Sequence, residues 1–469
     1  MGQNACIDVE TLKEELAAIA GAANVIATPQ GMENYSHDET SGLCAMPAVV
    51  VRPGSTAEVS AVLKLASSRS VPVTPRGAGT GLSGGAVPAR GGIVLSMERF
   101  DKILEIDADN LMAVVQPGVI TGVVQKAAEE KGLFYPPDPA SLDSCFIGGN
   151  VAENSGGPRA FKYGVTRKYL CGIEVVWADG RISRLGGKTI KNVAGYDLLG
   201  LVCGSEGTLG VVTEITLNLI PRPPEQADLL IPFPSIRKAV EAATAIIRAR
   251  IVPATMEFME RRAVDLTAEM LEKEAPFSGA EAHLLVQLDG PDKEQVQRQY
   301  EKIGEIALEY GAEDVLVAED KASSDRVWEF RRAIADALTH KSKTVKKEDI
   351  VVPRAKIPEM FDFLRSVEEK HGVYMVSFGH IGDGNIHVNL LKMDMPDQDW
   401  EAKAELALSE IYMQSVKMGG TITGEHGVGL MKKPHLPAAL DPAALDMMKR
   451  VKKALDPQGI LNPGKIFPD

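Results

Sequence analysis

Two histidines lie close together in segment 378–389, which reads FGHIGDGNIHVN. If Asp383 and Gly384 form a two-residue hairpin turn, His380 pairs directly with His387. The β-carbons of directly opposed residues lie ~5 Å apart, which allows two imidazoles to bind one metal ion. Asn389 follows two residues after His387 and so points to the same face of the strand. The segment therefore predicts half of a metal site.

A second histidine motif, TGEHGVG at 423–429, places Glu425 beside His426 between glycines. Neighbouring side chains point to opposite sides of an extended segment and diverge by about 100° in a helix. One ion is therefore not expected to bind both. A single histidine is usually satisfied by backbone or solvent, but two compact glycine-flanked motifs together favour a metal. The two motifs together predict a site for zinc or another divalent ion such as iron or manganese, and whether Glu425 or His426 binds it stays open at this point.

The composition restricts the class of protein that carries these motifs. The 469 residues include 64 acidic and 51 basic side chains, a formal charge of −13, which disfavours nucleic acid and anionic membranes as partners. No apolar run is long enough for a transmembrane segment and no basic, apolar leader is present, so we expect a cytoplasmic protein. The five cysteines form no CxxC pair, which excludes a cysteine-held zinc or iron–sulfur cluster.

The elements that must position the motifs fall into two parts. Short β-branched strands separated by glycine-rich connections fill 48–220, whereas strands alternate with amphipathic helices from Leu229 on, for example at 235–250 and 293–310. Both patterns indicate α+β folds, joined by the proline-rich stretch 221–224. We predict a cofactor domain at 1–222 and a substrate or cap domain at 225–417. A C-terminal segment, 418–469, is expected to pack back on the first domain.

A helix predicted around 323–338 carries an arginine on its apolar face. Val327, Phe330, Ile334 and Leu338 fall in one stripe at 100° per residue, and Arg331 lies within it. An arginine in such a place needs an anion. The partner is either a structural Asp or Glu or the carboxylate of a substrate, and the spacing leaves both open.

Three glycine-rich loops occur in the first part of the chain. The loop PRGAGTGLSGGA at 75–86 leads into the apolar strand IVLSM, and not into the long helix of a Rossmann dinucleotide fold. What it predicts is a nest of backbone amides suited to a pyrophosphate. The segments IGGNVAENSGGPR at 147–159 and GSEGTLGVVTEITL at 204–217 add two more such loops, and together they indicate one long ligand.

With PPDPAS at 136–141 and NPGK near the C-terminus, these loops resemble the FAD-binding domain of the vanillyl-alcohol oxidase and p-cresol methylhydroxylase (PCMH) superfamily. HIGDGNIHVN and TGEHGVG carry a narrower resemblance, to its FAD-linked D-2-hydroxy-acid dehydrogenases. These include glycolate oxidase FAD subunits, D-lactate dehydrogenases and D-2-hydroxyglutarate dehydrogenase. The resemblance implies an α+β fold, with a PCMH-type FAD-binding domain and a ferredoxin-like α+β substrate (cap) domain.

The resemblance also implies which residues contact FAD. The loop positions are Arg76, Gly77, Gly79, Thr80, Gly81, Ser83 and Gly84 for the pyrophosphate; Pro137, Asp138, Ser141, Gly148, Gly149, Asn154 and Gly156 for the isoalloxazine and ribityl chain; Gly207 and Val212 for the adenosine half; and Asn462 of the NPGK motif. Thr80 stands where several superfamily members have a histidine that links covalently to the flavin. Non-covalent FAD is therefore expected.

The same resemblance assigns Glu425 to the metal with His380 and His387, and leaves His426 facing the substrate hydroxyl as the base. It gives Arg331 the substrate carboxylate, and Asn389 is counted with the catalytic residues. Lys347 is the expected second carboxylate contact, with Lys346 as its competitor. Both lysines could equally form a charged strand edge.

These assignments predict an FAD- and divalent-metal-dependent dehydrogenase that oxidises a small D-2-hydroxy acid, D-lactate or glycolate, to the 2-oxo acid. Electrons would pass to an electron-transferring flavoprotein, an iron–sulfur subunit or a quinone, with O₂ less favoured, and a partner could bring the chain to a membrane. Two alternatives remain: a non-catalytic FAD electron-relay subunit, and a metal-free flavin oxidase of another alcohol class.

Overall fold

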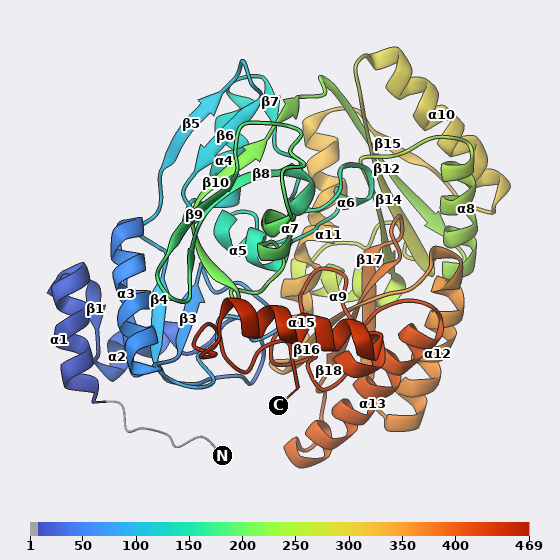
Figure 1. Cartoon of the computed structure of the whole chain (residues 1–469). Coiled ribbons are helices and arrows are strands. Elements are labelled where there is room, and N and C mark those ends of the chain that lie inside the picture. Colours follow the sequence, from blue (N-terminus) through green and yellow to red (C-terminus); the bar gives the residue numbers. More distant parts are fainter. Residues whose placement is uncertain (1–7, 469) are drawn as a thin grey trace. The chain divides into compact units, whose positions relative to one another are not determined.

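The computed structural model describes residues 8–468, a range that leaves out Cys6. The chain forms two compact units, and their elements are labelled in Figure 1. Unit 1 comprises Met1–Ser155, Val165–Arg222 and Glu425–Asp469, and unit 2 comprises Gly156–Gly164 and Pro223–Gly424. The chain thus passes between the units four times, once within the proline-rich stretch 221–224.

Unit 1 begins with a four-stranded sheet in the order β1-β2-β4-β3. Its strands are β1 (Val25–Ile26), β2 (Val49–Val51), β3 (Val73–Arg76) and β4 (Ile93–Ser96). β4 pairs in parallel with β2 and β3, and α1 (Val9–Ala20) and α3 (Thr56–Arg69) share a core with it. β2 and β4 are buried along their whole lengths, as expected for parallel strands covered on both faces. Residues 77–86, the first glycine loop, leave this sheet at the end of β3.

A second sheet of unit 1 is antiparallel, in the order β5-β6-β10-β8-β9. Its strands are β5 (Ile103–Asp107), β6 (Met112–Val115), β8 (Leu170–Trp177), β9 (Ile182–Gly186) and β10 (Gly210–Asn218). The other elements of unit 1 are η1 (Ala22–Asn24), α2 (Pro29–Met32), η2 (Glu33–Tyr35), α4 (Thr121–Glu129), β7 (Leu133–Phe134), α5 (Ile147–Glu153), η3 (Thr166–Tyr169), α7 (Leu198–Val202), β11 (Ile220–Pro221), α14 (Leu436–Ala439) and α15 (Pro442–Leu455).

Unit 2 is built on one antiparallel sheet in the order β15-β12-β14-β13-β17-β18-β16. The strands are β12 (Glu225–Phe233), β13 (Thr255–Glu260), β14 (Ala282–Gly290), β15 (Leu316–Ala318), β16 (Val345–Val351), β17 (Tyr374–His380) and β18 (Asn385–Leu391). β17 and β18 are central to the site, because they carry the two histidines of the first motif.

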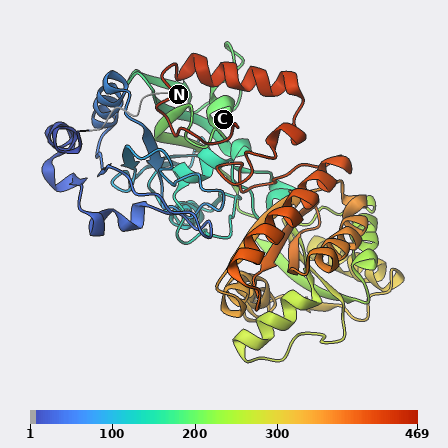
Figure 2. The same cartoon turned by 90° about the horizontal axis from the view of Figure 1, so that it is seen from below.

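Helices cover both faces of this sheet. α9 (Arg261–Leu271) and α11 (Lys321–Lys341) share a core with Met259, Val376 and Phe378 on one face. The others are α8 (Ile236–Arg248), α10 (Lys293–Glu309), α12 (Ile357–His371) and α13 (Asp397–Lys417), with the short α6 (Ala160–Tyr163) and η4 (Arg354–Lys356). α12 and α13 pack against each other, as both views show (Figure 1, Figure 2). The apolar stripe predicted for 323–338 is confirmed, since its four members are buried in α11.

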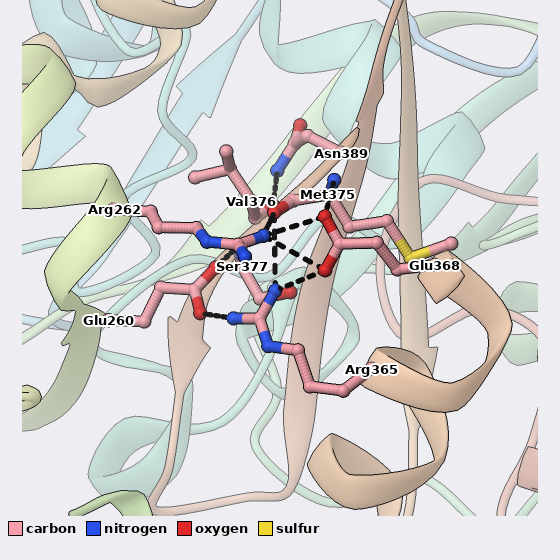
Figure 3. Close-up of polar contacts among 8 residues, drawn as sticks. All are labelled: Glu260, Arg262, Arg365, Glu368, Met375, Val376, Ser377 and Asn389. Carbon is pink, nitrogen blue, oxygen red and sulfur yellow. Dashed lines mark hydrogen bonds and ion pairs between the residues drawn. The ribbon is translucent and has the colours of Figure 1, made fainter. Parts of the chain in front are cut away.

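A cluster of charged residues from β13, α9 and α12 contacts β17 (Figure 3). Glu260 accepts a hydrogen bond from the Ser377 amide and forms an ion pair with Arg365. Glu368 accepts hydrogen bonds from Arg262, Arg365 and the Met375 amide. Because both carboxylates accept backbone amides of β17, this cluster ties the middle of the strand, at Met375 and Ser377, to α12.

The short segment 156–164 leaves unit 1 and anchors itself in unit 2. Lys162 forms an ion pair with Asp289 at the end of β14, and the Tyr163 hydroxyl donates to the same carboxylate over 2.5 Å. The aromatic ring of Phe161 lies against Gly382 of the histidine hairpin. Unit 2 is therefore assembled from two separate pieces of chain.

Within residues 8–468, none of the helices has the length and apolar character needed to cross a lipid bilayer.

Candidate active site

The histidine hairpin forms, but its predicted pairing is wrong. His380 pairs with Asn385, and His387 pairs with Phe378. The turn contains four residues, 381–384, because the Asp383 and Gly384 amides both donate to the His380 carbonyl, over 3.3 and 3.1 Å. The register is shifted by two residues from the expected one, and a shift of two keeps every side chain on its original face. His380 and His387 are therefore diagonal neighbours on one face.

The two imidazoles still converge. Their Nε2 atoms lie 3.4 Å apart, with ring centroids 5.1 Å apart and an angle of 85° between the ring planes. Ligand atoms ~2.0 to 2.1 Å from a tetrahedral zinc ion lie about 3.4 Å from each other. Both side chains are buried. The spacing of the nitrogens thus fits two ligands of one ion.

Asp349 connects the second motif to this hairpin. It lies opposite His387 in the β16–β18 ladder and accepts hydrogen bonds from the Thr423 hydroxyl at 2.9 Å and the Gly424 amide at 2.8 Å. Glu425 is the next residue, so its backbone begins where Asp349 holds the loop. One ligand atom from each of His380, His387 and Glu425 lies within 4.8 Å of the other two. These donors fit a divalent ion with further positions open.

Arg331 has a buried acidic partner. Glu257 of β13 lies opposite His380. It accepts a hydrogen bond from Arg331 Nε at 2.8 Å and forms an ion pair with Arg331 Nη2 at 2.6 Å. Its other oxygen lies 2.6 Å from His380 Nδ1. Burial by itself would raise the pKa of Glu257, but its contacts with His380 and Arg331 outweigh burial and lower it. Of the two partners that the sequence left open for Arg331, the structural acid is therefore present.

The guanidinium of Arg331 retains donors beyond this ion pair. Its Nη1 makes no hydrogen bond to any residue of 8–468, and the group stacks on the Phe378 ring at 4.8 Å. The side chain is 12% exposed, which leaves one edge accessible.

The two candidate lysines lie on opposite faces of β16. Lys347 pairs with Asn389 and so shares the face of His387, whereas Lys346 forms an ion pair of 2.9 Å with Glu401 of α13. Lys347 is half-buried and forms no ion pair with a described residue. The Asn389 amide donates to the Val376 carbonyl at 3.1 Å (Figure 3), and the residue lies two positions after His387 on the same face of β18. Only Lys347 can therefore extend from the face that carries the histidines.

The residues after His426 are held within unit 1. Glu206 accepts the amides of Val428 and Gly429 at 2.8 and 2.7 Å. Burial raises the pKa of Glu206, against the effect of these two hydrogen bonds. Along the chain, the Glu425–His426 pair is thus flanked by held backbone amides, that of Gly424 bound by Asp349 and those of Val428 and Gly429 bound by Glu206.

The three glycine loops meet within unit 1 at the end of β3. A β-carbon on Gly77 would lie 3.8 Å from the Cα of Gly149, and one on Gly207 would lie 3.4 Å from the Pro75 side chain. Within the described chain, no backbone amide from Gly77 to Ser83 donates a hydrogen bond to another residue. The buried Ser83 hydroxyl is likewise unpaired in the described chain. A run of free amides beside an unpaired hydroxyl fits a pyrophosphate.

Several predicted FAD residues have clear places around these loops. Arg76 donates to the carbonyls of Asn34 and His37, at 2.8 and 2.7 Å, and burial lowers its pKa. Asn462 donates to the carbonyls of Gly85 and Glu206, so its amide ties the C-terminal segment to two glycine loops. The remaining positions are Gly79, Thr80, Gly81, Ser83 and Gly84 in the first loop; Pro137, Asp138 and Ser141 between β7 and α5; Gly148 and Gly149 in α5, with Asn154 at its C-terminal end; Val212 in β10; and Gly156, which belongs to unit 2.

Sequence reasoning missed four supporting residues. Glu257, Asp349 and Glu206 are buried acids in apolar or glycine-rich stretches, and such acids signal a specific partner. Thr40, in the segment YSHDET at 35–40, accepts from the Gly84 amide at 2.8 Å. Each lies far along the chain from the motif that it supports.

Comparisons with known proteins identify the family of the chain. The family described as "FAD linked oxidases, C-terminal domain" matches residues 222–466, and "FAD binding domain" matches residues 47–186. Glycolate oxidase subunit GlcD of Bacillus subtilis is 44% identical over 456 residues, covering 97% of this chain and 96% of that protein. D-lactate dehydrogenase of Anaerostipes hadrus is 39% identical over 440 residues, covering 92% of each.

Among solved structures, p-cresol methylhydroxylase with substrate bound matches with a TM-score of 0.81 at 18% identity, covering 98% of this chain and 97% of that one. The expected α+β fold with a PCMH-type FAD-binding domain is thereby confirmed. The chain therefore belongs to the family of FAD-linked oxidases and dehydrogenases that GlcD and D-lactate dehydrogenase represent, and it is an FAD-dependent oxidoreductase.

Proposed function

We propose that this enzyme is a divalent-metal-dependent dehydrogenase that oxidises a small D-2-hydroxy acid, D-lactate or glycolate, to the 2-oxo acid. The observation that carries the proposal is the convergence of ligand atoms from His380, His387 and Glu425. The printed names of the two relatives, a glycolate oxidase subunit and a D-lactate dehydrogenase, support the substrate class.

The chain's own residues divide the work of the reaction. When bound, FAD supplies the two-electron acceptor and the divalent ion supplies Lewis acidity at the hydroxyl oxygen. His380, His387 and Glu425 hold the ion, and His426 takes the hydroxyl proton. A positioned general base contributes ~10² to 10⁴ in rate. Since Glu425 and His426 are adjacent, their side chains diverge, which separates the role of ligand from that of base.

The substrate carboxylate needs cations, and unit 2 offers two on the histidine side of its sheet. Arg331 extends from α11 with its Nη1 edge available, and Lys347 extends from β16 beside Asn389. A planar guanidinium can bind a carboxylate through two parallel hydrogen bonds, whereas the lysine provides a single point charge. We propose Arg331 as the main contact and Lys347 as the second.

Electrons must leave the reduced enzyme through a partner. The relative GlcD is named as a subunit, which supports an acceptor protein, either an electron-transferring flavoprotein or an iron–sulfur subunit. A membrane quinone is the other acceptor class. We further propose that the enzyme acts in the cytoplasm.

The test is anaerobic mixing of the purified enzyme with D-lactate, glycolate, D-glycerate or D-2-hydroxyglutarate, with flavin absorbance as the readout. We expect bleaching by D-lactate or glycolate, no bleaching after the metal has been removed with a chelator, and recovery on adding zinc or manganese. A matched sample with L-lactate tests the stereochemistry.

Each alternative gives a different result. A non-catalytic electron relay predicts no bleaching with any of the acids, while the same sample is still bleached by dithionite. A metal-free oxidase of another alcohol class predicts a flavin signal that is unaffected by the chelator. Either result would overturn the proposal.

A further inference from the structure

Glu257 has no role in the function proposed above, yet it contacts two of the residues used there. One carboxylate oxygen lies 2.6 Å from His380 Nδ1, and the other lies 2.6 Å from Arg331 Nη2. The side chain is completely buried, at 0% exposure. Glu257 is therefore the link between a proposed metal ligand and the proposed carboxylate contact.

The hydrogen bond to His380 decides which ring nitrogen faces the ion. A neutral imidazole carries one proton, and Nδ1 donates it to Glu257. Nε2 is then left with its lone pair, and this is the atom that lies 3.4 Å from His387 Nε2. Carboxylates in this place orient metal-binding histidines and make them more basic.

The ion pair with Arg331 reduces the electrostatic repulsion between the arginine and a bound divalent ion. A divalent ion and an arginine near each other repel, and Glu425 is the one anionic ligand among the three donors. Glu257 adds a second negative charge between the arginine and the histidine. With both carboxylates the group of ion, acids and arginine has a net charge of +1, which suits a monoanionic substrate.

We propose that Glu257 is a positioning residue that fixes the metal-binding tautomer of His380 and the orientation of Arg331 together. The inference rests on the proposed function, because it needs the metal at His380. A purely structural ion pair between β13 and α11 is the competing explanation, and the two differ in what they predict for metal binding.

The test is the metal affinity of Glu257→Gln, measured by titrating the chelator-treated, FAD-loaded protein with zinc in competition with a chromophoric chelator. Glutamine keeps the shape of glutamate, but one of its two terminal groups is an NH2 donor. This group faces the N–H of either His380 or Arg331, so one of these two residues loses its acceptor. We expect the zinc Kd to rise ~10- to 100-fold, as for other residues that support a metal ligand. Cobalt(II) in place of zinc should give an altered visible spectrum.

Glu260→Gln is the matched control. Glu260 is buried and pairs with Arg365 (Figure 3). It lies three residues after Glu257 on the same strand, and alternation along the strand places it on the opposite face of the sheet. This variant should lose stability to urea and keep the wild-type zinc Kd within about twofold. A wild-type zinc Kd in folded Glu257→Gln would overturn the inference.

Failure of the proposed function is a separate result, because wild-type protein would then bind no zinc. If Glu257→Gln does not fold, Glu257→Asp decides. Aspartate keeps the charge but is one methylene shorter, so it cannot reach both partners. A raised zinc Kd in Glu257→Asp supports the inference, and an unchanged Kd overturns it.

Discussion

Asp349 should control metal affinity through the backbone of the loop that carries Glu425. Its carboxylate accepts the Thr423 hydroxyl on one oxygen and the Gly424 amide on the other, at 2.9 and 2.8 Å, and the side chain is 0% exposed. In Asp349→Asn, one of the two acceptor oxygens becomes an NH2 group and the negative charge is lost. If the NH2 group faces the Gly424 amide, that buried amide has no acceptor. If it faces Thr423, the hydroxyl can turn to accept from it, and the Gly424 amide then donates to a neutral acceptor in place of a charged one.

The cost follows from this geometry. Leaving one buried donor without an acceptor costs ~1 to 3 kcal/mol. The loop relieves that cost by moving away, and metal binding must bring Glu425 back. Since 1.4 kcal/mol corresponds to a factor of ten, the zinc Kd should rise about 5- to 140-fold. The milder Thr423→Val, which removes a single hydroxyl, should fall at or below the lower end of this range.

The assay is the same competition titration with zinc, combined with urea unfolding. Asp228→Asn is the matched control, because Asp228 is also a buried acid of unit 2. It accepts hydrogen bonds from Gln287, Ser324 and Trp328, but it lies on β12, several strands away from the histidines. This control should lower the free energy of unfolding and keep the zinc Kd. The reasoning would be refuted if Asp349→Asn bound zinc as tightly as the wild type. It would also be refuted if Asp349→Asn and Asp228→Asn lost equal zinc affinity.

Three further predictions concern other parts of the site. Glu425→Ala removes the one anionic ligand, so metal analysis should find no bound ion and substrate should no longer bleach the flavin, while FAD absorbance is retained; bleaching at the wild-type rate would contradict the metal mechanism. Lys347→Ala should raise the KM for D-lactate ~10- to 140-fold, since a hydrogen bond to a charged group contributes ~1.5 to 3 kcal/mol and 1.4 kcal/mol is a factor of ten, whereas Lys346→Ala, on the other face, should leave the KM unchanged. Gly79→Ala places a β-carbon against the Arg76 guanidinium at a φ of +78°, so the purified protein should contain less FAD than the wild type, and an equal flavin-to-protein ratio would contradict the role of this loop.

The sequence predicted which face of the hairpin carries the histidines better than it predicted their pairing. Alternation along a strand is local, so Asn389 was correctly placed with His387. The turn length depends on which amides bind the His380 carbonyl, and DG at 383–384 is equally compatible with a two-residue and a four-residue turn. The predicted and observed registers differ by two residues. Because this number is even, the face of each side chain was predicted correctly although the direct pairing of His380 with His387 was not.

The supporting acids could not be predicted in the same way. Glu257 lies 123 residues before His380, and Asp349 lies 74 residues before Thr423. Only the strand order β13-β17-β18-β16 brings them together, and that order is a non-local property. Arg331 illustrates this limit of sequence analysis. Its helix and apolar stripe were predicted correctly, but its acidic partner, Glu257, is known only from the strand order of the sheet.

The separate segment 156–164 also limits how the protein can be divided. A polypeptide that starts at Pro223 and ends at Gly424 omits Lys162 and Tyr163, and Asp289, with a side chain 11% exposed, then loses both of its partners. The first 222 residues expressed alone would carry that anchor with nothing to bind. Recombination between relatives must therefore exchange two stretches at once to transfer an intact substrate unit. A split version of the enzyme should reassemble only when the anchor segment travels with one half and Asp289 with the other.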